Sequence, residues 1–237
     1  IWKLRGEIGV DGIYQENLMQ DGDRVFLPNY RSTGAALYAI ERYYGEDWAL
    51  EGGLRYDYRW YEAFNPEGRN QQVVRYEYNF NNLSGTVGFT KEVNRNWQLT
   101  TTISNAWRSP QANELFSAGL HQGAARIELG NKNLLPERAY NLNIESKNKF
   151  GNRLSTDVSL YTQYINNYIY LEPGTDILTI RGYFQVFDYK QTNAHLTGTD
   201  LSAAFAWNDK FNTTARASFL LARDVVRKDW LILMPAD

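Results

Sequence analysis

The amino-acid sequence predicts an all-β fold: a portion of an antiparallel transmembrane β-barrel, with about nine strands that follow one another in a meander. Three observations support this prediction. Apolar and polar side chains alternate over many segments, short and long connections alternate along the chain, and aromatic residues gather beside the short connections. Aromatic residues make up 15% of the 237 residues, enough to supply the rings of aromatic side chains that flank a membrane barrel.

The clearest alternation runs from residue 48 to residue 60. Its even positions are Trp, Leu, Gly or Tyr, and its charged residues all stand at odd positions: Glu51, Arg55, Asp57 and Arg59. Because successive side chains in a strand point to opposite faces, one face is apolar and the other is charged. The segment is about as long as a strand that crosses a bilayer at a tilt. We therefore expect the apolar face to meet lipid and the four charged residues to face the lumen.

Eight further segments alternate in the same way, and a strand is expected in each. They are residues 2–10, 35–41, 83–90, 97–104, 140–145, 154–164, 201–207 and 211–221. No amphipathic helix pattern competes with them, and no apolar run approaches the roughly 18 residues that a membrane-spanning helix requires.

The connections between these segments alternate in length. Short turns are expected at residues 45–47, 94–96, 150–152 and 208–210. Long loops are expected at about 15–29, 63–75, 108–136, 173–182 and from 223 onward. Outer-membrane barrels have short periplasmic turns and long extracellular loops. The aromatic residues beside the short turns are then expected to form an interfacial girdle: Tyr43, Tyr44, Trp48, Trp97, Phe150, Trp207 and Phe211.

The chain is expected to be an internal portion of a larger barrel, with residues 1–237 forming one partial barrel domain. The strand pattern already includes Trp2, no signal peptide precedes it, and the predicted number of strands is odd. The sequence ends with the apolar residues 230–235, and nine strands are not expected to close a barrel by themselves.

Composition excludes several other classes of protein. There are no cysteines, which removes disulfide frameworks and thiolate chemistry, and there are only two histidines. The formal net charge of −2 argues against a nucleic-acid partner.

The longest predicted loop carries four sequence motifs in order. They are Trp107-Arg108-Ser109-Pro110, Asn113-Glu114-Leu115-Phe116, Gly119-Leu120-His121-Gln122-Gly123, and Gly130-Asn131 continuing through Leu134 to Pro136-Glu137. This ordered series closely resembles the barrel of the TonB-dependent outer-membrane receptors. The segments 53–57, 166–171 and 194–200 are also similar to strands of that family, although Asp200 stands where the family more often has Glu.

The resemblance implies a barrel of about 22 strands in the outer membrane of a Gram-negative bacterium, closed by an N-terminal plug domain. It implies a transporter and not an enzyme, with no cofactor of its own. The cargo would be a small, scarce metal-containing ligand: a siderophore, haem or zinc. Outer-membrane lipid surrounds such a barrel, and TonB supplies energy through the plug region. No plug motif is present in this sequence, and the closing strands are expected to be missing as well.

His121 is the sharpest candidate for ligand binding. The resemblance places it between two motifs that flank a ligand histidine in haem receptors of the family, and an imidazole can bind haem iron or zinc. The alternative is that His121 ties the loop together by hydrogen bonds, as in family members with other ligands.

Four further loop residues are candidates for contact with cargo: Arg108, Glu114, Phe116 and Glu128. The alternative for the charged residues is that, with Glu137, they form salt bridges and caps that order the loop. The four charged residues of segment 48–60 are expected to face the lumen, either as structural ion pairs or in contact with a plug.

Two other classes of protein remain open on the sequence alone. An outer-membrane barrel lipase or protease would need a Ser-His or carboxylate arrangement, and the sequence has no Gly-x-Ser-x-Gly motif. A soluble β-sheet binding domain would also show alternating strands, but it would not explain aromatics beside the short turns.

Overall fold

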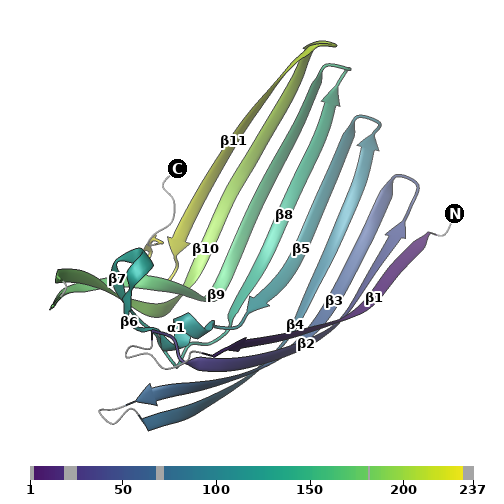
Figure 1. The fold of residues 1–237 in the computed structure, drawn as a ribbon. Helices are drawn as coiled ribbons and strands as arrows, with labels where there is room; N and C mark the ends of the chain where they lie inside the picture. Colours follow the sequence, from purple (N-terminus) through teal and green to yellow (C-terminus); the bar gives the residue numbers. More distant parts are fainter. Residues whose placement is uncertain (1–2, 19–25, 68–71, 181, 232–237) are drawn as a thin grey trace.

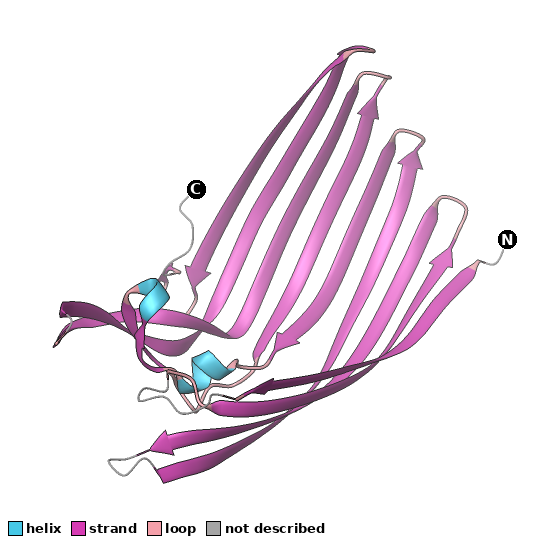
Figure 2. Ribbon diagram, viewed as in Figure 1, coloured by secondary structure: helices cyan, strands magenta, loops and turns pink. Residues whose placement is uncertain are grey.

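The computed structural model describes residues 3–18, 26–67, 72–180 and 182–231. They form one large antiparallel sheet that curves like part of a barrel wall, with two short helical segments at one end (Figures 1 and 2). Within this described part of the chain, none of the helices has the length and apolar character needed to cross a membrane. The expected strand position of Trp2 and the apolar residues 232–235 lie outside the described residues.

Ten strands lie side by side in the order β1-β2-β3-β4-β5-β8-β9-β10-β11-β12. Their bounds are β1 Leu4–Asn17, β2 Asn29–Tyr44, β3 Trp48–Glu67, β4 Gln72–Asn94, β5 Trp97–Arg108, β8 Glu137–Phe150, β9 Leu154–Thr179, β10 Gly182–Asn208, β11 Phe211–Asp224 and β12 Asp229–Trp230. Each of the first nine contains one of the predicted segments, so the predicted all-β meander is confirmed. The four short turns all lie at one end of the sheet and the longer connections at the other (Figure 1).

One face of the sheet is covered with exposed apolar side chains. Val10, Leu54, Leu83 and Ile103 expose 82%, 63%, 61% and 61% of their surface, respectively. Monomeric soluble proteins rarely expose apolar patches of such extent, whereas the lipid-facing wall of a barrel requires one. The charged residues of β3 stand on the opposite face, where the sheet is concave.

The predicted girdle residues lie on the apolar face beside the short turns, with one exception. Trp48, Trp97, Phe150, Trp207, Phe211 and Tyr43 are all exposed there. Tyr44 is wrong as a girdle residue: it pairs with Ala49 on the concave face and lies under the Arg5 guanidinium, 5.7 Å from ring centroid to Cζ.

Two of the predicted long loops are wrong because the strands continue through most of them. β3 and β4 stay paired from Trp48 opposite Lys91 out to Glu67 opposite Gln72. β9 and β10 stay paired out to Thr179 opposite Gly182. Beyond the lipid, a hairpin does not need an apolar face, because both of its faces meet water or protein. The alternation that indicates a strand in the sequence therefore disappears, although the backbone hydrogen bonds between the two strands continue. The tips 19–25 and 68–71 and residue 181, which belong to predicted loops, lie outside the described residues.

The predicted loop 108–136 also contains secondary structure. It holds α1 (Ala112–Phe116), β6 (Ala118–His121), the 3₁₀ turn η1 (Gln122–Ala124) and β7 (Arg126–Leu129). β6 pairs with β7, and β7 runs parallel to β10. Each element has only three to five residues, too few for a periodic pattern to appear in the sequence.

A positive charge in the middle of the apolar face should destabilise the barrel. Ile103 lies six residues from Trp97, near the middle of the apolar band, so Ile103→Arg in the full-length receptor should cost about 2–4 kcal/mol of folding free energy in lipid vesicles. The neighbouring Thr102→Arg substitution places the same charge on the concave face and should fold almost normally. Denaturant titration of vesicle-inserted protein measures both, and equal losses would contradict the assignment of the faces.

Candidate functional site

Helix α1 lies against the concave face at the end of the sheet that carries the long connections (Figure 2). Leu115 and Phe116 are 1% and 3% exposed. The Phe116 ring packs on the rings of Tyr61 and Tyr76, with centroids 6.4 and 5.4 Å away, and Ile169 of β9 joins the same cluster. The loop is therefore folded inward, and α1 contacts strands from both halves of the curved sheet.

Arg108, at the end of β5, connects four parts of the structure. Its Nη1 donates to both carboxylate oxygens of Glu114, at 2.8 Å each, and its Nε donates to Glu137 Oε2 at 2.9 Å. Glu114 also accepts the backbone N–H of Gln111 and caps α1. The other oxygen of Glu137 accepts the N–H of Ile169 at 2.6 Å. Each of these charges thus has a partner within the loop or on an adjacent strand.

Glu128 in β7 is the most enclosed charge of the site, with 2% of its surface exposed. Its Oε1 lies 2.9 Å from His121 Nδ1 and accepts from Arg126 Nε at 2.8 Å, while Tyr189 Oη donates to Oε2 at 3.3 Å. Burial acts to raise the pKa of Glu128, but the hydrogen bonds from His121 and Arg126 outweigh it and hold the pKa below its ordinary value. Glu128 is therefore a fixed anion beneath the histidine.

His121 presents its other ring nitrogen to the surroundings. Its side chain is 45% exposed, its ring centroid is 5.2 Å from that of Phe26, and no hydrogen bond to Nε2 is found among the described residues. A carboxylate on Nδ1 favours the tautomer with a lone pair on Nε2, the arrangement common in metal-bound histidines. No cluster of three or more His, Cys, Asp or Glu residues suited to a metal ion occurs in the described ranges.

Two pairs of predicted loop residues are connected through hydrogen bonds of Asn113 and Tyr189. Arg108 contacts Glu114, and His121 contacts Glu128. Asn113, next to Glu114, donates to Tyr189 Oη at 3.0 Å, and Tyr189 in turn donates to Glu128. Phe116 lies apart in the tyrosine cluster and is almost completely buried.

Sequence reasoning missed the contact that holds this loop to the β3–β4 hairpin. Lys132 Nζ binds Glu67 Oε1 and lies 4.5 Å from the centroid of the Tyr76 ring. Tyr76 Oη donates to the same Glu67 oxygen at 2.7 Å, and Tyr78 Oη donates to the Lys132 carbonyl at 3.1 Å. No local pattern reveals this contact, because Lys132 and Glu67 are 65 residues apart.

The four charged residues predicted to face the lumen stand together on the concave face of β3. Glu51 pairs with Arg42, and Arg55 donates to Asp57 at 2.8 Å and to Asp11 at 3.1 Å. Asp57 also accepts from Trp107 Nε1 at 3.1 Å, and Arg59 donates to Ser32 Oγ at 2.9 Å. Arg55, Asp57 and Arg59 border a hollow of about 290 Å³, formed by β1, β2, β3, the end of β5 and the start of the ordered loop. Glu51 and Arg42 lie outside this hollow, nearer the short turns.

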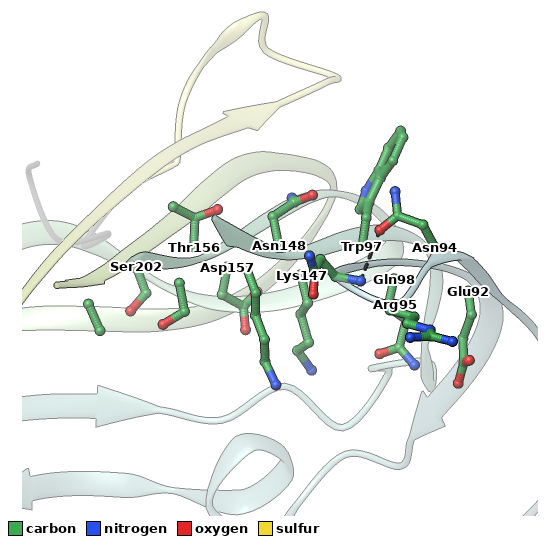
Figure 3. Close-up of a pocket in the computed structure, with 14 residues that line it drawn as sticks. Glu92, Asn94, Arg95, Trp97, Gln98, Lys147, Asn148, Thr156, Asp157 and Ser202 are labelled. Carbon is green, nitrogen blue, oxygen red and sulfur yellow. Dashed lines mark hydrogen bonds between the residues drawn. The ribbon is translucent and has the colours of Figure 1, made fainter. Parts of the chain in front are cut away.

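A second polar hollow of about 560 Å³ lies on the concave face near the short turns. Figure 3 shows Gln98, Lys147 and Asp157 pointing to one side of the strands while Trp97 and Asn148 point to the other. Lys147 pairs with Glu145 at 3.0 Å. Both hollows on the concave face are lined mainly by polar side chains, as is typical of the wall of a water-filled or plugged lumen.

Comparison with known proteins identifies this architecture as the barrel of an outer-membrane receptor. The family described as "TonB dependent receptor-like, beta-barrel" matches residues 6–230. The chain belongs to this family, whose barrels lie in the outer membrane of Gram-negative bacteria. Family members and structural neighbours are receptors and transporters, not enzymes.

Solved structures with the same fold include the copper transporter OprC, with a TM-score of 0.76, 17% identity, and coverage of 97% of this chain and 37% of that chain. The FrpB iron transporter from Neisseria meningitidis (F3-3 variant) gives a TM-score of 0.62 and 18% identity, over 97% of this chain and 35% of that one. The Serratia marcescens hemophore receptor HasR, solved as a double mutant in complex with its hemophore HasA and heme, gives a TM-score of 0.63 and 14% identity. The match covers 96% of this chain and 54% of that chain. The chain thus spans between about a third and a half of their lengths.

Removing the Arg108 guanidinium should loosen the ordered loop. Arg108→Gln leaves Glu114 and Glu137 without their shared partner. The free energy that keeps the loop folded against the strands should fall by about 1.5–3 kcal/mol. Hydrogen exchange in the full-length receptor should show faster exchange over residues 112–129. Arg138→Gln, an exposed arginine with no ion pair among the described residues, is the control, and similar exchange in both variants would contradict this role of Arg108.

The contact between Lys132 and Glu67 should open only in strong acid. Hydrogen bonds from Lys132, Tyr76 and Asn65 lower the pKa of Glu67 from 4.5 to about 2. Because the folded-state pKa is depressed, the stabilisation is complete above about pH 4.5 and is lost as the pH falls towards 2. Hydrogen exchange of residues 130–134 should follow that window, and the Glu67→Gln variant should show no such dependence. A transition centred near pH 4.5 in the unmodified protein would refute the lowered pKa of Glu67 and the predicted acid range.

Proposed function

We propose that the receptor containing this chain imports a scarce metal-containing ligand across the outer membrane. Family membership over residues 6–230 supports a receptor barrel, and the ordered loop with His121 above a buried Glu128 is the observation that carries the ligand class. One imidazole can bind a metal that arrives with most of its own ligands. The chemistry therefore favours a complex such as haem or a ferric siderophore over bare zinc, which needs three or four protein ligands.

The loop suits a contact with such a ligand because it is rigid but partly open. Glu128 fixes the imidazole, and Arg126 and Tyr189 fix Glu128. The His121 side chain remains 45% exposed. Carboxylate partners of this kind fix the tautomer and the ring orientation of a ligand histidine. We propose Arg108, Glu114 and Phe116 as supporting residues, because they fix helix α1, and Asn113 of that helix is connected to Glu128 through Tyr189.

Energy for import would come from TonB through a plug domain, as for the family. In this proposal, Glu51, Arg55, Asp57 and Arg59 face the plug across the lumen. Glu51 pairs with Arg42, and Arg55 pairs with Asp57 and Asp11, so these charges have partners of opposite sign on the wall itself.

Deleting the full gene should abolish growth on one metal source while other sources still support growth. Cells supplied in turn with haem, ferric siderophores or zinc as the limiting metal source provide the measurement. The loss should be restored by the intact gene. Normal growth of the deletion strain on every source would refute the proposed import function.

His121 should matter in a way that depends on the ligand. For a haem ligand, His121→Ala should remove the visible-spectrum signature of imidazole-bound iron, and Glu128→Gln should weaken binding by about 10- to 100-fold. Gln122→Ala, one residue away and exposed, is the control. An unchanged haem spectrum in the His121 variant would exclude His121 as an iron ligand and leave it the loop-tying role.

A further inference from the structure

A row of aromatic and cationic residues crosses the lipid-facing side of β8 to β12. Tyr140 pairs with Tyr164, Tyr164 with His195, and His195 with Arg223, which pairs with Trp230. Directly paired residues on antiparallel strands share a face. Tyr140 and Trp230 are 48% and 55% exposed on the same apolar face as Leu142 and Leu221, so the whole row points towards lipid.

The row lies at the extracellular edge of the apolar band. Arg223 is 12 residues along β11 from Phe211, and His195 is 12 residues along β10 from Trp207, both girdle residues beside the short turn. At a rise of about 3.3 Å per residue and a tilt of about 40°, that span is roughly 30 Å of height, slightly more than the apolar band. Charged residues at this depth lie where lipid head groups lie.

Arg223 has no ion-pair partner among the described residues. Its guanidinium lies over the Trp230 ring, 4.7 Å from the centroid. By contrast, Arg227 a few residues away pairs with Glu172 and with Asp224. The ring holds the guanidinium of Arg223 in place, and no carboxylate of the described residues pairs with it.

His195 adds polar groups beside this charge. Its Nε2 lies 2.8 Å from Thr162 Oγ1 and 3.4 Å from Thr197 Oγ1, on the same face. An arginine, an imidazole and two hydroxyls grouped in this way are suited to the oxygens of a phosphate group.

An apolar hollow of about 690 Å³ begins at His195 and continues across the face towards β3. Leu142, Ile103, Val87 and Leu54 contribute its walls. Gly85 pairs with Leu54 and with Asn105, and the Leu54 side chain lies over Gly85 at the β3 end of the hollow. The hollow is shallow and open, and its mainly apolar lining suits a hydrocarbon chain that lies along the surface.

We propose that this surface binds one phosphate-bearing lipid of the outer leaflet. The lipid phosphate contacts Arg223 and His195, and an acyl chain lies in the hollow that ends at Leu54. Cationic pockets beside a hydrocarbon surface recognise anionic lipids by this combination of charge and apolar contact. The site is independent of the transported ligand, because it lies on the opposite face of the sheet from His121.

The test uses the full-length receptor in phosphatidylcholine nanodiscs that contain lipid A, or lipid A stripped of its phosphates. Bound lipid is measured by native mass spectrometry after release from the nanodisc. Arg223→Gln combined with His195→Gln should lower the retention of phosphorylated lipid A by about tenfold or more. Arg223→Lys keeps the positive charge and should retain most of the phosphorylated lipid A. Resistance to denaturation in detergent verifies that each variant is folded.

Arg216→Gln is the matched control, since Arg216 lies on the same strand and pairs with Ser202 on the lumen face. It should retain lipid as the unmodified receptor does. The proposal would be overturned if Arg216→Gln lost as much phosphorylated lipid A as the combined Arg223→Gln and His195→Gln variant. Equal retention of phosphorylated and dephosphorylated lipid A by the unmodified receptor would also overturn it. Displacement of the lipid by inorganic phosphate at matched concentration would also overturn it, because the acyl chain would then contribute nothing.

Discussion

The structure depends on one constraint: a strand surrounded by lipid must satisfy its backbone hydrogen bonds within the sheet and turn apolar side chains outward. The long antiparallel ladders from β1 to β11 meet the first requirement, and the exposed Leu, Val, Ile and aromatic residues of one face meet the second. The other face is then free to carry charge. Because β3 satisfies both requirements over the same residues, it separates a lipid surface from a polar lumen within the thickness of a single strand.

The ordered loop uses the lumen side of that division. α1 buries Leu115 and Phe116 on the concave face, and Arg108 connects the helix to the strands through Glu114 and Glu137. His121 and Glu128 are carried by β6 and β7, which β10 supports through parallel pairing. A loop of about thirty residues would lose much conformational entropy on ordering. Buried apolar contacts and charge-assisted hydrogen bonds offset that loss here, so the candidate ligand residues are held in place before any ligand arrives.

The sequence was sufficient to predict the strands within lipid, because the two environments of a spanning strand produce a pattern with a period of two. It was insufficient beyond the membrane, where β3, β4, β9 and β10 continue without that pattern. Of the candidate site, the four motifs revealed the loop and contain Arg108, Glu114, Phe116 and His121, whereas Glu128 was a candidate only as a charged residue of the same loop. It could not reveal that Lys132 binds Glu67 or that Trp107 binds Asp57, because such contacts depend on strand register over 50 residues or more. The tyrosine cluster around Tyr61 was likewise hidden, since its members come from three separate strands and α1.

Spin labels placed one at a time at residues 54 to 58 of the full-length receptor in lipid vesicles test the division of faces most directly. Collisions with oxygen report lipid, and collisions with a water-soluble nickel chelate report the aqueous lumen. The account predicts that oxygen accessibility is high at Leu54, Tyr56 and Tyr58 and low at Arg55 and Asp57, with the nickel chelate showing the opposite alternation. Uniform accessibility along these residues, or the reverse alternation, would contradict it.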